Sequence, residues 1–169
     1  MVSTCTLTEK MKTIYEIKPI GIIHSPFKKR EDTPIQPVFA KGAEGTVELL
    51  PGYAEGISDI DGFERIWLIY LFDRVREVKL KVVPFRDTVE RGVFATRAPS
   101  RPNSVGLSAV KLIGVEGSNL KVVDIDILDG TPLIDIKPYI PQVDSFPDSK
   151  AGWFDAKRVD RRRADSRFE

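Results

Sequence analysis

Glycine and proline interrupt this chain so often that almost no window is long enough for an ordinary helix. The 169 residues include 12 glycines and 12 prolines, and both residue types weaken or end helices. An isolated helix needs roughly 12–15 residues to be stable in water. A helical core is therefore disfavoured, and the core must be built from short extended segments.

Short apolar or alternating runs between these interruptions predict about eight strands. In residues 121–127 the apolar positions alternate with Asp124 and Asp126, which predicts a strand with one wet face. Residues 66–72 are apolar at every position and predict a central strand covered on both sides. Residues 117–119 predict a hairpin connection. The predicted strands are 14–25, 45–50, 63–72, 78–83, 92–96, 107–115, 120–128 and 133–136.

Regular spacing of short strands predicts an all-β fold, mainly antiparallel, as a sandwich or a barrel; a barrel has no exposed edges. We expect a flexible N-terminus at residues 1–13, one domain at 14–148 with a long loop at 25–45, and a basic C-terminal tail at 149–169. From Lys150 onward the tail carries seven basic and four acidic residues. It is interpreted as a terminal helix, a nucleic-acid-binding arm or a solvated disordered segment.

Composition excludes several classes of function. With 26 Lys and Arg against 25 Asp and Glu, the net charge of +1 excludes binding of nucleic acid by bulk charge. One cysteine (Cys5) and one histidine allow neither an internal disulfide nor a standard zinc site, which favours a reducing, cytoplasmic location and predicts no metal. No apolar run can span a bilayer. Phosphate-binding glycine loops and nucleophile elbows are missing, and His24 is interpreted as a hydrogen-bonded residue at a strand end.

Residues 92–108 present two arginines and an amide on a stiff turn. Pro99 and Pro102 fix the backbone around Arg97, Arg101 and Asn103. Guanidinium groups held this way suit the recognition of an anion or a nucleotide. A proline-rich connection with solvated arginines is the alternative interpretation.

Residues 120–148 are locally acidic, with six aspartates against two lysines. Carboxylates at strand ends can hold a cation, a ribose hydroxyl pair or a sulfonium group. Asp129 with Gly130 is also an ordinary turn dipeptide, and Asp124 and Asp126 can simply solvate a sheet face. The spacing does not specify a magnesium site.

Five segments, in order, resemble the TsaA-like tRNA methyltransferases: residues 20–26, 34–37, 62–67, 92–108 and 126–139. The resemblance extends over about residues 14–148. Members of that family use S-adenosylmethionine to methylate N6 of threonylcarbamoyladenosine beside the tRNA anticodon. The resemblance therefore implies a small β-barrel that binds this cofactor without a Rossmann fold, usually as a homodimer.

The resemblance also implies which residues contact the cofactor. Arg97 would bind the amino-acid carboxylate, Leu107 and Pro37 would enclose the adenine, and a carboxylate such as Asp129 would stabilise the sulfonium. Bacterial members often have histidine at the position of Asp73, and they have a longer C-terminal portion. The full set is Ile35, Gln36, Pro37, Asp73, Arg74, Arg97, Leu107, Ile127, Leu128, Asp129 and Gly130.

No single general base can be chosen from the sequence, and the candidates are Asp129 and Tyr139. For contact with the tRNA anticodon loop we expect Arg91, Arg101 and Asn103, together with the basic tail. Phe94 and Trp153 can stack on an unpaired base, although Phe94, inside a predicted strand, is expected in the core. The alternatives are a barrel that binds a nucleoside or single-stranded RNA without catalysis, and a module that recruits other RNA-modification proteins.

Overall fold

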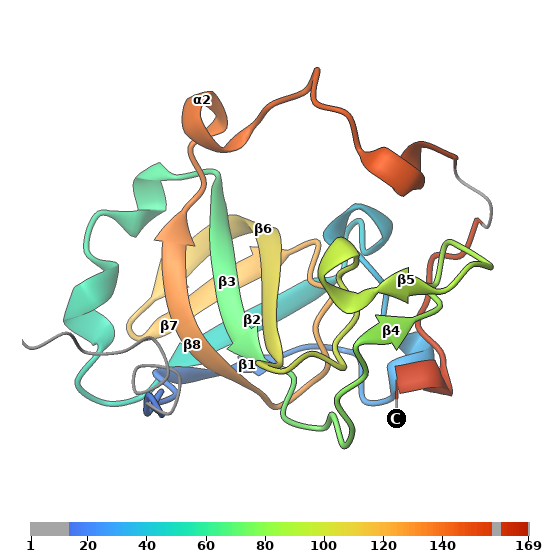
Figure 1. The fold of residues 1–169 in the computed structure, drawn as a ribbon. Helices are drawn as coiled ribbons and strands as arrows, with labels where there is room; N and C mark the ends of the chain where they lie inside the picture. The colour runs from blue at the N-terminus through green and yellow to red at the C-terminus, as the bar shows by residue number, and fades with distance from the viewer. Residues whose placement is uncertain (1–13, 157–159, 169) are drawn as a thin grey trace, which may run out of the picture.

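The structure is a computed structural model in which residues 14–156 and 160–168 are described (Figure 1). Six antiparallel strands form a closed barrel in the order β1-β2-β7-β6-β3-β8. The predicted flexible N-terminus at residues 1–13, with Cys5, lies outside the described residues. The barrel strands are β1 (Gly21–His24), β2 (Glu44–Leu49), β3 (Arg65–Leu71), β6 (Val105–Glu116), β7 (Asn119–Val123) and β8 (Thr131–Pro138).

Two further strands, β4 (Lys81–Val82) and β5 (Arg91–Gly92), form a separate small sheet beside the barrel. The predicted all-β, mainly antiparallel fold is thus confirmed, and the barrel replaces the sandwich alternative. The remaining short elements are η1 (Arg30–Asp32), η2 (Pro37–Phe39), η3 (Ala54–Ile57), η4 (Ile60–Gly62), η5 (Val93–Ala95), α2 (Pro141–Asp144), η6 (Gly152–Ala156) and η7 (Ser166–Phe168). None of the helices in the described segments is long and apolar enough to cross a membrane.

Alternating burial along β3 explains why the barrel closes around an apolar interior. Ile66, Leu68 and Tyr70 point into the core, where they pack with side chains from every other barrel strand. Gly106, opposite Tyr70 on β6, leaves room for the Tyr70 ring, because a Cβ there would lie 2.2 Å from it. The prediction that residues 66–72 are covered on both sides was wrong, since the outward residues of β3 are only half-buried.

Three other predictions about strands need correction. The first strand begins only at Gly21, and β7 ends at Val123, because Asp124 adopts a left-handed backbone with φ of 66°. Strand β5 ends at Gly92, and η5 follows it where a strand was predicted. Phe94 therefore lies outside the core with 75% of its surface exposed.

The C-terminal tail packs against the rest of the molecule. Phe168 is 6% exposed and joins a small second cluster with Val82, Val93 and Ala98. The backbone of residues 162–164 pairs with that of residues 33–35. Figure 1 shows this red segment beside β4 and β5. Solvated disorder is therefore wrong for residues 160–168, which contain one short 3₁₀ helix, η7.

Candidate functional site

The segment between β7 and β8 crosses one end of the barrel and closes it. Ile125 and Ile127 are buried in the barrel core although they belong to no strand. The Ser25 hydroxyl donates a hydrogen bond of 2.6 Å to the Ile127 carbonyl, which ties the segment to the end of β1. We call residues 124–130 the crossing segment. Its apolar residues fill the core, so its polar residues are held at the mouth of the barrel.

At the end of the crossing segment, Asp129 is fixed by three neighbours. Its carboxylate accepts a hydrogen bond of 3.0 Å from the Ser25 backbone and contacts the Lys28 ammonium at 2.6 Å. The Arg74 guanidinium donates a 2.6 Å hydrogen bond to the Asp129 carbonyl. The hydrogen bond from Lys28, followed by that from Ser25, lowers the pKa of Asp129 below its ordinary value. Asp129 is therefore a stable carboxylate and a poor acceptor for a catalytic proton.

Asp73 and Arg74, predicted as cofactor contacts, lie beside this turn. Arg74 approaches Gly130 so closely that a Cβ at that glycine would lie 3.3 Å from the guanidinium. The Asp73 carboxylate lies 3.8 Å from Arg74. With Leu128, Asp129 and the basic residues of 28–30, Arg74 lines an open depression of about 520 Å³.

Gln36 and Arg97 meet although 61 residues separate them. The Arg97 guanidinium donates a hydrogen bond of 2.6 Å to the Gln36 side-chain oxygen. Pro37 begins η2, which lies next to β6. On β6 the Leu107 side chain is 52% exposed. This group therefore presents a guanidinium, an amide and an apolar surface together.

A buried polar chain lies beside Arg97. The Ser108 hydroxyl donates a 2.6 Å hydrogen bond to Asp126 Oδ1, and the Tyr70 hydroxyl lies 3.1 Å from Ser108 Oγ. Burial raises the pKa of Asp126 to about 7, against the opposing effects of the Ser108 hydrogen bond and the Arg97 charge. Burial, with the nearby Asp126 charge, also raises the pKa of Tyr70, so the phenol stays neutral. The idea that Asp126 only solvates a sheet face was therefore wrong.

The predicted cofactor residues thus form two groups that the crossing segment joins. One group contains Gln36, Arg97 and Leu107, and the other contains Arg74 and the turn at Asp129. Asp126 interacts electrostatically with Arg97 and precedes Asp129 by three residues, at most about 10 Å of backbone, so the crossing segment connects the two groups. An exposed guanidinium, carboxylates and an open apolar surface fit S-adenosylmethionine, which carries a carboxylate, a sulfonium and an adenine.

Tyr139 does not join this site. It follows β8, whereas Asp129 precedes β8, and the strand of eight residues is about 26 Å long. Its ring packs edge-to-face on Trp67, with 5.4 Å between ring centroids. The two residues predicted as candidate bases therefore lie at opposite ends of β8.

The residues predicted to bind RNA are partly committed to internal contacts. Arg91 donates two hydrogen bonds, of 2.9 and 2.8 Å, to the buried Asp87 carboxylate. One terminal nitrogen of Arg101 donates to the carbonyls of Val93 and Thr96, while Asn103 is exposed. The guanidinium of Arg101 lies 5.7 Å from the centre of the exposed Phe94 ring. Their contact with RNA stays a prediction.

The C-terminal segment borders the same region through aromatic contacts. The Trp153 indole donates a 2.7 Å hydrogen bond to the Ala95 carbonyl, in η5. Arg86 lies between the rings of Phe39 and Phe154, at 5.3 and 5.2 Å from their centres. The segment thus supports both loops that carry Gln36 and Arg97.

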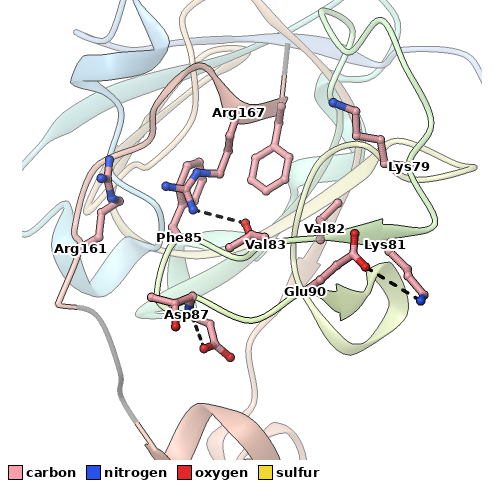
Figure 2. Close-up of a pocket in the computed structure, with 11 residues that line it drawn as sticks. Lys79, Lys81, Val82, Val83, Phe85, Asp87, Glu90, Arg161 and Arg167 are labelled. Carbon is pink, nitrogen blue, oxygen red and sulfur yellow. Dashed lines mark hydrogen bonds and ion pairs between the residues drawn. The ribbon is translucent and has the colours of Figure 1, made fainter.

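A second cavity, of about 540 Å³, lies between the β4–β5 sheet and the C-terminal segment (Figure 2). Phe85 and Phe168 form its apolar side. Its cations are paired within the protein: Lys81 lies near Glu90, and Arg167 reaches both Asp165 and the Val83 carbonyl. The cavity contains none of the predicted cofactor residues.

Several residues of the site were missed by reasoning from the sequence. Ser25, Lys28, Tyr70 and Ser108 are far from the crossing segment in sequence, and three of them lie in or beside strands where they look structural. The only signal in the sequence was Asp126, one of two acids that alternate with apolar residues in 121–127. Within residues 14–156 and 160–168, no group of His, Cys, Asp and Glu could hold a metal ion.

Comparison with known proteins identifies the family. The model of the tRNA-methyltransferase O N-terminal domain matches residues 22–145. A probable S-adenosyl-L-methionine-binding protein of Pyrococcus abyssi is 49% identical over 153 residues, covering 89% of this chain and 83% of its own length. The tRNA (adenine(37)-N6)-methyltransferase of Escherichia coli is 36% identical over 149 residues, covering 82% of this chain and 63% of its own length.

Solved structures give the same result. The crystal structure of TrmO from Pseudomonas aeruginosa superimposes with a TM-score of 0.70 at 38% identity, covering 83% of this chain and 63% of that one. This chain therefore spans less than two thirds of that protein and of the Escherichia coli enzyme. The family match covers more than half of the chain, and the resemblance seen in the sequence is confirmed: the chain belongs to the tRNA-methyltransferase O family.

Proposed function

We propose that the chain is an S-adenosylmethionine-dependent tRNA (adenine-N6)-methyltransferase whose substrate is threonylcarbamoyladenosine beside the anticodon. Membership of the family supports the reaction class and the cofactor. The observation that carries the proposal is that the crossing segment links the Gln36–Arg97 pair, through the electrostatic interaction of Arg97 with Asp126, to the turn at Asp129. These motif residues are distant in sequence and form a surface suited to a zwitterionic, sulfonium-bearing nucleoside.

Each part of the cofactor has a complementary group in this site. Arg97 would bind the amino-acid carboxylate, and Gln36 already holds that guanidinium in place. Leu107 and Pro37 would cover the adenine, and the Asp129 carboxylate would stabilise the sulfonium. When bound, the cofactor supplies an electrophilic methyl group. The protein then has chiefly to position the acceptor nitrogen, which can contribute about 7–11 kcal/mol to lowering the barrier.

Binding of tRNA is proposed on the side of the barrel that carries Phe94. Its exposed ring, steadied by Arg101, is suited to stacking on an unpaired base. Asn103 is exposed, and Arg91, although paired with Asp87, and the arginines of the C-terminal segment are proposed to face phosphates. A tRNA affinity that does not fall with added salt would contradict the phosphate contacts.

A homodimer and a cytoplasmic location are part of the same proposal. The exposed apolar side chain of Val38 in η2 provides surface that a second copy could cover near the cofactor site. Light scattering over a range of concentrations tests the dimer. The cytoplasmic location is proposed because the proposed substrate is tRNA.

The proposed function is tested by incubating the protein with S-adenosylmethionine and tRNA isolated with or without threonylcarbamoyladenosine, followed by nucleoside mass spectrometry. We expect a mass gain of one methyl group on the modified nucleoside alone. Calorimetry should show that Arg97→Ala abolishes cofactor binding. Lys121→Ala, which removes a cation near the β6–β7 hairpin, should leave binding unchanged.

The other outcomes identify the alternatives. If the protein binds RNA but does not bind S-adenosylmethionine, whether or not tRNA is added, the non-catalytic barrel is favoured. Binding of neither would favour an interaction module. Methylation of unmodified adenosine would keep the enzyme class and refute the proposed substrate.

A further inference from the structure

Asp126 lies at the mouth of the barrel in a setting different from that of every other described carboxylate. It projects from the crossing segment onto Ser108 of β6, between the two groups of predicted cofactor residues. We propose that Asp126 is the general base that accepts the proton from N6 of the substrate adenine. This inference rests on the proposed function and assigns a residue role within it.

The hydrogen bonds around Asp126 have a defined direction. Ser108 has one hydroxyl proton and donates it to Asp126 Oδ1 at 2.6 Å, so Tyr70, at 3.1 Å, donates to Ser108 Oγ. Both hydroxyls are buried, at 1% and 4% exposure of their residues, and come from the adjacent strands β6 and β3. The chain from Tyr70 to Ser108 to Asp126 thus holds the carboxylate in one orientation.

The second oxygen of Asp126, Oδ2, is not engaged by any other described residue, although the carboxyl also accepts a hydrogen bond from its own backbone N–H. The charged or titratable groups around the carboxyl are Tyr70 from β3 and Arg97 from the segment after η5, with the Ser108 hydroxyl from β6. An N–H group placed at the mouth would therefore find an oriented acceptor oxygen.

The proton affinity of Asp126 suits this role. Burial raises its pKa to about 7, so the carboxylate is present at neutral pH and is still basic enough to take a proton. Asp129 is the opposite case, because Lys28 stabilises its charged form and lowers its pKa. Tyr139 lies beyond the other end of β8. Neither of the candidates named from the sequence matches the geometry and basicity of Asp126.

The step balances with the groups named. The N6–H bond breaks and its proton passes to Asp126 Oδ2. The electron pair of N6 forms the bond to the methyl carbon, and the carbon–sulfur electrons leave with sulfur as a neutral thioether. One negative and one positive charge are removed together, so no further reactant is needed.

The experiment measures single-turnover methylation from pH 5.5 to 9 with saturating cofactor. The wild type should lose activity below about pH 7 as Asp126 is protonated. Asp126→Asn keeps an acceptor oxygen for Ser108 but cannot take a proton, so its rate should fall by about 10²–10⁴-fold and lose this acid limb. Its affinity for the cofactor should change only a few-fold. Asp124→Asn, which alters an aspartate paired with Arg65, is the matched control. It should keep the wild-type rate and the wild-type loss of activity below about pH 7.

A second variant keeps the proposal testable if Asp126→Asn folds poorly. The Ser108 hydrogen bond lowers the pKa of Asp126, so Ser108→Ala should move the acid limb to higher pH. Full activity of Asp126→Asn, or a limb unmoved by Ser108→Ala, would overturn the inference while leaving the methyltransferase intact. A wild type that binds the cofactor but methylates no tRNA would instead overturn the proposed function and this inference with it.

Discussion

The barrel and the loop-rich lobe beside it are held together by different forces. The barrel has a continuous antiparallel ladder around a core of 14 buried residues. Among its described residues, the lobe formed by β4, β5, η5 and the C-terminal segment has four buried apolar residues in its cluster. It depends on ion pairs and cation–π contacts, such as those of Arg86 and Arg167 with aromatic rings. Hydrophobic burial dominates stability, so we expect the barrel to be the stable unit and the lobe to open locally.

The predicted cofactor site lies at the junction of these two regions. Gln36 and Arg97 come from loops that the lobe supports, whereas Asp126 is fixed to the barrel wall by Ser108. The acidic group is therefore placed by the barrel, and the guanidinium by loops whose supporting lobe we expect to open locally. We therefore expect substitutions in the lobe to lower cofactor affinity, and substitutions in the barrel core to lower the free energy of unfolding.

Removing a barrel core side chain should give the largest effect. Leu68→Ala removes a fully buried side chain of β3 and should lower the free energy of unfolding by about 2–5 kcal/mol. Urea denaturation measures this loss. Ile113→Ala, on the exposed bulge of β6, is the control and should change stability by less than about 0.5 kcal/mol. Equal losses in both variants would contradict the division between core and surface.

Asp126 should make the barrel less stable as pH rises. Its pKa is raised from 3.8 to about 7 in the folded state, so the folded protein binds more protons than the unfolded chain between these values. Stability contributed by this group is therefore lost as pH rises through 7. Asp126→Asn cannot lose a proton at this position, so it does not show this loss. The free energy of unfolding of the variant minus that of the wild type should therefore increase by on the order of 2–4 kcal/mol between pH 5 and pH 8. Urea denaturation measures both free energies of unfolding at each pH. If the wild type and Asp126→Asn changed in parallel with pH, the idea that burial raises the pKa of Asp126 would be refuted.

Loss of Phe168 should loosen the lobe without unfolding the barrel. Phe168→Ala removes the aromatic partner of Phe85, and the free energy of global unfolding should fall by only about 1 kcal/mol. Limited proteolysis near residues 160–168 should become faster, and cofactor affinity should fall several-fold, because this segment pairs with residues 33–35 beside Gln36. Phe146→Ala, at an exposed position, is the control. A loss as large as that of Leu68→Ala would show that the lobe and barrel unfold together.

The barrel was predictable from the sequence to the extent that its signals are local. Glycine and proline positions gave the number of strands, and alternation gave the buried face of residues 121–127. The same alternation continues past Val123, where the ladder stops, because Ile125 and Ile127 fill the end of the barrel without belonging to a strand. The alternation of apolar residues indicates which side chains are buried, and in this segment the buried side chains continue beyond the last hydrogen-bonded residue of β7.

The site was less predictable because its contacts join distant segments. The partners of Asp129 and Arg97 lie 104 and 61 residues away, so no local pattern could identify Ser25 or Gln36 as neighbours. Reasoning from residue types also chose Asp129 as a candidate base and left Asp126 as an acid that can simply solvate a sheet face. Burial against Ser108 and pairing with Lys28 give them opposite pKa shifts, and only the fold separates these environments.

The smallest effect should come from Asp129, and its pH dependence should oppose that of Asp126. Hydrogen bonds from Lys28 and the Ser25 backbone lower the pKa of Asp129 in the folded state. The charged carboxylate therefore stabilises the fold at pH values above its unfolded-state pKa of 3.8, and this stabilisation is lost as the pH falls through the lower pKa of the folded state. Asp129→Asn should therefore lower stability by about 1 kcal/mol or less at pH 7, because the pair with Lys28 is partly exposed. The difference from the wild type should vanish in acid. Asp61→Asn, an exposed position in η4, serves as the control and should be neutral throughout. An Asp129→Asn deficit that instead grew as pH fell would mean that the Lys28 pair does not hold the carboxylate in its charged form.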